Sequence, residues 1–218
     1  MRTTYFFMSI LIAVSLIFTG CGADSEEPTT EEPESNTKTD FIDGKVVTIN
    51  DHTFDESDLE FYTLMNKVKI ILMKEAAEKN DDDLTYYDEQ LKYYDFVNAN
   101  LQELIELYSM SLLAKEKNYF IPDDQLVEEK EKFNAQIEES KEATSLIEEF
   151  GEDTYKQKID EYIRQVLLRD RIAQDLEQEV IDENPDASEE EINYLTENKY
   201  DDLYMAQMET LEVEVHVH

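Results

Sequence analysis

The side chains that most often perform catalysis are scarce in this sequence. Its histidines are His52, His216 and His218, whereas a Ser/His/Asp hydrolase needs a histidine held rigidly against its nucleophile. None of them is well placed for that role, because His52 adjoins an expected strand and the others stand at the last residues. His216 and His218 would share one strand face and could bind a metal ion, but no third ligand accompanies them. We therefore expect neither a catalytic histidine nor a metal site.

Glycines and acidic runs exclude further classes of site. After Gly22 the only glycines are Gly44 and Gly151, so loops that cradle phosphates and dinucleotide-binding fingerprints are excluded. The run Asp81 to Asp83 lacks the glycine and the distal glutamate of a calcium-binding loop, and it indicates a solvated helix end. Paired carboxylates occur throughout a chain with 54 acidic residues, so they identify no site. The sequence predicts a protein that is not an enzyme and holds no cofactor.

The single cysteine, Cys21, indicates chemistry of another kind. It follows an apolar run from Tyr5 to Phe18, which is typical of a secretory signal and shorter than the roughly 20 residues of a membrane-spanning helix. The segment Phe18-Thr19-Gly20-Cys21 resembles the bacterial lipobox, with phenylalanine where that motif usually has leucine. We expect residues 1–20 to be a cleaved signal peptide and lipid on Cys21 to anchor the chain at the extracytoplasmic face of the cell membrane. The alternative is an ordinary signal peptide and an incidental cysteine.

Charge and composition divide the remaining chain in two. Residues 21–40 lack any large apolar side chain, so we expect a flexible acidic tether, followed by one domain over residues 41–218. The formal charge of −35 argues against nucleic acid and against docking on anionic lipid. It favours basic partners, or it does no more than keep the surface well solvated.

Two short segments have the pattern of strands. Lys45 to Asn50 is β-branched and is followed by a turn signal, and Leu211 to Val217 alternates apolar and polar side chains. Pairing these segments with each other would protect both edges and bring the ends of the domain together. The expected fold class is therefore mainly α-helical with a small two-stranded β element.

Apolar spacings of three and four residues predict long helices between the two strands. The first begins near Ser57, with Glu60 completing a capping box, and runs towards Lys79. A second, much longer helix contains no glycine or proline and extends from Leu84 towards Asn118. Three further helices are expected: one with Pro122 in its first turn, one after Gly151 with Asp153 or Thr154 as the cap, and one that begins at a capping box of Ser188 and Glu191.

The second helix carries more apolar surface than one packing contact needs. Beyond its core stripe it presents Tyr86, Tyr93 and Phe96 on a neighbouring face, with Leu107 and Met110 further along. Tyrosine rings are stable when half in water, and flexible methionines adapt to varied partners. These five residues are the expected client-binding residues, unless another helix covers that face.

The order of these segments resembles the SurA and PrsA type of extracytoplasmic chaperone domain, which is related to the client-binding part of trigger factor. The resemblance spans most of the domain and is carried by the segments Val46–Asn50, Leu101–Leu107, Ile121–Leu126 and Tyr162–Arg169. The sequence departs from the pattern at Asp51, where the family often has glycine, and in a tyrosine-rich insert at residues 80–96.

The resemblance implies a function. Many members insert a parvulin-type peptidyl-prolyl isomerase domain before the final strand, but only Ile181 to Leu211 is available here, and this interval is glycine-free and mostly helical. We expect a membrane-anchored chaperone that binds unfolded secreted polypeptides without isomerase activity. The alternatives are an envelope adaptor with one dedicated protein partner, and an inhibitor or substrate-binding lipoprotein.

Overall fold

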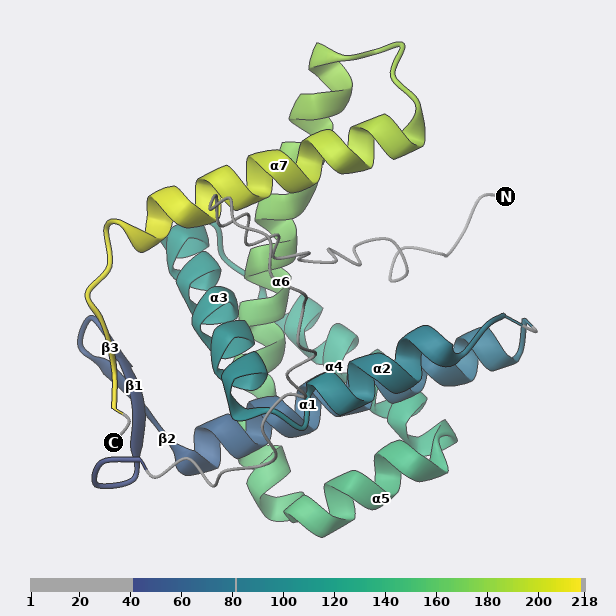
Figure 1. The fold of residues 1–218 in the computed structure, drawn as a ribbon, viewed down its shortest axis with the longest axis vertical. Helices are drawn as coiled ribbons and strands as arrows, with labels where there is room; N and C mark the ends of the chain where they lie inside the picture. The colour runs from purple at the N-terminus through teal and green to yellow at the C-terminus, as the bar shows by residue number, and fades with distance from the viewer. Residues whose placement is uncertain (1–40, 81, 217–218) are drawn as a thin grey trace, which may run out of the picture. The chain divides into compact units, whose positions relative to one another are not determined.

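The computed structural model describes residues 41–80 and 82–216, which fall within the compact unit Lys38–His218. Cys21, the expected signal peptide and the expected tether lie outside these described residues. Helices dominate the chain order (Figure 1), which runs β1 (Lys45–Ile49), β2 (His52–Asp55), α1 (Glu56–Glu78), α2 (Thr85–Tyr93), α3 (Val97–Glu116), α4 (Asp123–Glu139), α5 (Lys141–Phe150), α6 (Glu152–Glu183), α7 (Glu189–Met208) and β3 (Val213–Val215). The prediction of a mainly helical fold with a small sheet is confirmed at this level.

The sheet has three strands in the order β2-β1-β3, not the two that were expected. The antiparallel pairing of β1 with β3 is confirmed, with Val47 opposite Val215. The additional strand arises because Asn50 adopts a positive φ of 51°, which turns the chain back so that β2 pairs with β1. Asn50 also holds the chain at the start of β3. Its side-chain oxygen accepts a hydrogen bond at 3.0 Å from the backbone amide of Glu212, the residue just before β3.

The start of α1 differs from the expected capping box. Asp55, the last residue of β2, is the N-cap, and its carboxylate accepts a hydrogen bond from the Asp58 amide at 2.9 Å. In the reciprocal bond, the Asp58 carboxylate accepts from the Asp55 backbone amide at 3.0 Å. Ser57 and Glu60 therefore lie inside the helix. The helix begins earlier than expected because β2, which was not expected, ends in the extended residue Asp55, and an extended aspartate can serve as N-cap.

Two expected helices are each divided in two. The long second helix is interrupted by residues 94–96, which separate α2 from α3. The third is interrupted at Ser140, whose hydroxyl donates to a carboxylate oxygen of Glu75 on α1 at 2.7 Å and accepts from the Ala143 amide at 3.1 Å. Ser140 therefore ends α4, caps α5 and ties that junction to α1.

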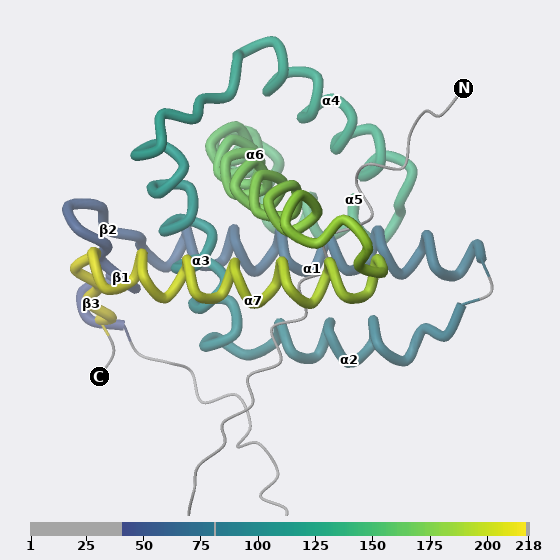
Figure 2. Tube along the Cα trace, turned by 90° about the horizontal axis from the view of Figure 1, so that it is seen from above, coloured from purple at the N-terminus to yellow at the C-terminus, as the bar shows by residue number. Residues whose placement is uncertain are grey.

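The long helix α6 packs against four other helices. It contacts α3, α4, α5 and α7, and α1 serves as a second centre of packing that contacts α2, α3, α4, α5, β1 and β2. Figure 2 shows α1 and α2 side by side, and Figure 1 shows α7 crossing in front of α6. The start of α7 is as expected, because Ser188 is its N-cap and accepts a hydrogen bond from the Glu191 amide. The start of α6 is not, since Gly151 occupies the N-cap position.

Candidate functional site

Helix α2 contributes almost nothing to the core. None of its residues, all of which the structure describes, is buried. Tyr86 and Tyr93 are 39% and 43% exposed, and Phe96, at the start of α3, is 38% exposed. These three residues have the partly exposed position that was expected of them. We call them the aromatic surface, because they place large rings where a second molecule can reach them.

Leu107 and Met110 do not belong to this surface. They are only 5% and 0% exposed, so the expectation that they lie on an accessible face is wrong. The expected face assumed one continuous helix, whereas the interruption at residues 94–96 gives α3 a rotation of its own. With Leu104 and Ala114 they form a stripe at spacings of three and four that is buried in the core.

Ion pairs attach α2 to α1 in place of apolar burial. The Lys74 ammonium lies 2.6 Å from a carboxylate oxygen of Asp88 on α2. The Lys67 ammonium lies 2.5 Å from a carboxylate oxygen of Asp95, just after α2. Both carboxylates are about half exposed, and pairs of this kind contribute roughly 1 kcal/mol or less each. Helix α2 is therefore attached weakly along its length.

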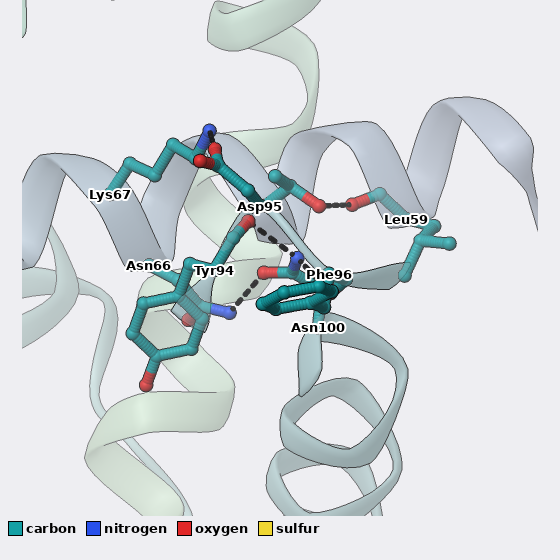
Figure 3. Close-up of polar contacts among 8 residues, drawn as sticks. Leu59, Asn66, Lys67, Tyr94, Asp95, Phe96 and Asn100 are labelled. Carbon is teal, nitrogen blue, oxygen red and sulfur yellow. Dashed lines mark hydrogen bonds and ion pairs between the residues drawn. The ribbon is translucent and has the colours of Figure 1, made fainter. Parts of the chain in front are cut away.

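The end of α2 is held more firmly, by two buried asparagines. The Asn100 side-chain amide donates hydrogen bonds to the carbonyl oxygens of Tyr94 at 2.9 Å and Phe96 at 3.0 Å (Figure 3). Asn66 on α1 donates to the Asn100 side-chain oxygen at 3.0 Å. Asn100 thereby gives a partner to the Tyr94 carbonyl at the end of α2 and a second one to the Phe96 carbonyl, which also accepts from the Asn100 backbone amide, while Phe96 stays extended at φ −88° and ψ 131°.

One turn after Asn100, Glu103 of α3 lies close to tyrosines from several elements. The Tyr94 hydroxyl donates to its carboxylate at 3.4 Å. Burial raises the pKa of Tyr93 and Tyr94 above the usual range, and the charge of Glu103 raises both further. Burial and the carboxylates of Glu106 and Glu103 raise the pKa of Tyr204 on α7 to about 12. The Glu103 carboxylate thus raises the pKa of tyrosines both at the end of α2 and on α7.

Charged and tyrosine side chains from α1, α6 and α7 lie close to Glu103 of α3. The Arg169 guanidinium donates to Asp170 at 2.7 and 3.0 Å. Although burial opposes its charge, the Asp170 carboxylate raises the pKa of Arg169 above its usual range. The Lys69 side chain keeps contact with water, yet the surrounding protein lowers its pKa and the charge of Arg169 lowers it further. The charged cluster, as it is called below, consists of Lys69, Glu103, Glu106, Arg169 and Asp170 with the neighbouring tyrosines Tyr162, Tyr200 and Tyr204.

Sequence reasoning missed the charged cluster. Its helical spacing offered a signal, because Tyr162 and Arg169 are seven residues apart on α6 and Tyr200 and Tyr204 are four apart on α7. Each such pair places polar groups on a face that also carries apolar residues. This spacing does not by itself predict a cluster, because a charged helix face usually indicates nothing more than solvation.

The arrangement offers contacts of two kinds, aromatic and charged. Half-exposed aromatic rings beside groups of both charges can contact varied polypeptide sequences. Within residues 41–80 and 82–216, no group of three or more metal-ligating side chains comes together. No helix in the part of the chain that the structure describes is long and apolar enough to span a bilayer.

Comparisons with known proteins leave the family open. No family model matches the chain, and neither the curated proteins nor the solved structures include a match.

Proposed function

We propose that this chain is a membrane-anchored extracytoplasmic chaperone that holds unfolded secreted polypeptides on the aromatic surface and has no isomerase activity. The observation that carries the proposal is that no residue of α2 is fully buried, while Tyr86, Tyr93 and Phe96 remain 38% to 43% exposed. A helix whose only role was packing would bury its aromatic rings, because burial of such a ring contributes roughly 1.5–3 kcal/mol.

Charge supports an unfolded and basic polypeptide as the bound partner. The net charge of −35 attracts basic segments over a distance, and the exposed tyrosines then supply short-range contact that tolerates many sequences. Lipid on Cys21, as expected from the lipobox, would place this surface where polypeptides emerge from the membrane.

Aggregation of an unfolded basic client tests the proposal. The full-length protein is expected to suppress aggregation, and the variant Tyr86→Ser/Tyr93→Ser/Phe96→Ser is expected to lose most of that activity. Serine at position 96 is compatible with the fold, because this position is the N-cap of α3 and serine is favoured there. The matched control is Tyr194→Ser, which removes a tyrosine that is 65% exposed on α7. Equal suppression by the triple variant and the wild type would refute the proposal.

A dedicated envelope partner is the second candidate, and the charged cluster favours it. Arg169 forms two hydrogen bonds of fixed geometry with Asp170, and these side chains are 19% and 27% exposed, so a partner that offers one defined surface can reach them. One envelope protein that co-purifies in fixed stoichiometry, together with no effect on client aggregation, would favour this function over the first.

A further inference from the structure

A groove lies between α4, α5 and α6. It has a volume of about 360 Å³, near the lower end of the range for ligand pockets. Its floor consists of one isoleucine from each helix, Ile137, Ile147 and Ile159, which are 6%, 7% and 3% exposed. Tyr155 closes one wall, since its hydroxyl donates to the Asn134 side-chain oxygen at 2.9 Å. The groove therefore has an apolar floor held in place by fixed side chains.

The rim of the groove is asymmetric in charge. Its two lysines are already paired, Lys130 with Asp160 at 2.7 Å and Lys156 with Glu152 at 2.8 Å. Glu138 on α4 and Glu148 on α5 also line the groove, and neither forms an ion pair or hydrogen bond within the residues that the structure describes. The groove thus offers two uncompensated carboxylates beside an apolar floor.

We propose that this groove binds a lysine or arginine side chain from a basic segment of another polypeptide. The aliphatic stem of that side chain lies on the isoleucine floor, and its cationic head lies between Glu138 and Glu148. Lysine and arginine combine these two parts, an apolar stem and a charged end, in one side chain. An acidic ligand is disfavoured because both rim lysines are paired, and a second copy of this chain is disfavoured by its charge of −35.

The inference does not depend on the chaperone function, because the groove and the aromatic surface share no residue. A protein that fails to suppress aggregation can still bind a basic side chain here. Conversely, suppression that persists after the groove carboxylates are neutralised would show that client holding does not depend on them.

Titration of the full-length protein, carrying ¹³C-labelled isoleucine methyl groups, with a short capped peptide tests the site. The probe has one arginine between two leucines, and a second peptide has glutamine in its place. We expect the arginine peptide to shift the methyl resonances of Ile137, Ile147 and Ile159 saturably, and the glutamine peptide to bind more weakly. Unchanged isoleucine resonances, or equal affinity for both peptides, would overturn the proposal.

Neutral variants separate the site from general attraction to an acidic surface. Glu138→Gln/Glu148→Gln is expected to weaken binding of the arginine peptide roughly 3- to 10-fold, as for partly exposed ion pairs. The matched control is Glu131→Gln/Glu149→Gln, which removes the same charge from exposed positions on the same two helices, outside the groove. An equal loss of affinity in both double variants would overturn the proposal.

Discussion

The Tyr200 hydroxyl of α7 donates a hydrogen bond to a carboxylate oxygen of Glu106 on α3, at 3.0 Å. Tyr200 is 1% exposed, so this bond connects the two helices within the core. Burial raises the pKa of both groups above their usual ranges. The fold therefore holds a carboxylate at a position where its charged form is disfavoured.

Glu106 makes stability depend on pH in a defined direction. Because its pKa is raised from 4.5 in the folded state, its ionisation destabilises the fold as pH rises through that higher pKa, and the penalty vanishes below about pH 4.5. Glu106→Gln is therefore expected to raise Tm at pH 7 and to give no advantage near pH 4. Thermal unfolding of both proteins across this range checks the prediction, and a lower Tm for the variant at pH 7 would contradict it.

Asn100 is expected to be essential for the interruption between α2 and α3. Asn100→Ala removes two hydrogen bonds to backbone carbonyls and leaves the buried Asn66 amide without its partner, so it should destabilise the fold by about 1–3 kcal/mol. Asn198→Ala removes one comparable bond to the Tyr194 carbonyl at an exposed site and should cost about 0.5 kcal/mol or less. Chemical denaturation compares the two variants, and equal losses would contradict this account.

Much of the fold is predictable because its signals are local. Alternation in Leu211 to Val217 indicated the strand that pairs with β1, and Ser188 marked the start of α7. The interruptions were not predictable in this way. Asn100 has the sequence context of a helix interior, and its partner Asn66 is 34 residues away. Ser140 likewise depends on Glu75, which is 65 residues away.

The same limit applies to the candidate site. Exposure of Tyr86 and Tyr93 followed from helical spacing within α2, whereas Phe96 is exposed from an extended position outside that helix. Leu107 and Met110 were misplaced because that spacing was carried across an interruption which only tertiary contacts create.

Met110 should therefore act through stability and not through client contact. It is fully buried, and Met110→Ala is expected to destabilise the fold by about 2–5 kcal/mol. Tyr93→Ala, at a residue 43% exposed, should destabilise much less and yet weaken client binding more. Denaturation and client-binding affinity, both measured where each variant is folded, check this. Equal losses of affinity would contradict it.

The attachment of α2 should respond to charge. Lys74→Asp removes its ion pair with Asp88 and is expected to speed amide hydrogen exchange in α2 roughly 2- to 5-fold. Exchanging the two charges in Lys74→Asp/Asp88→Lys should restore slow exchange, since the pair is re-formed in the opposite order. Exchange that is as fast in the swapped protein as in the single variant would show that the pair does not hold α2.

The exposed rings of α2 are expected to contact unfolded polypeptide directly. Site-specific photo-crosslinking tests it, with a photoreactive phenylalanine analogue at Tyr93 or, as the matched control, at the exposed Tyr194 of α7. With an unfolded basic client present, position 93 is expected to give the cross-linked product and position 194 little or none. Cross-linking that is absent at position 93, or equal at both positions, would contradict the account.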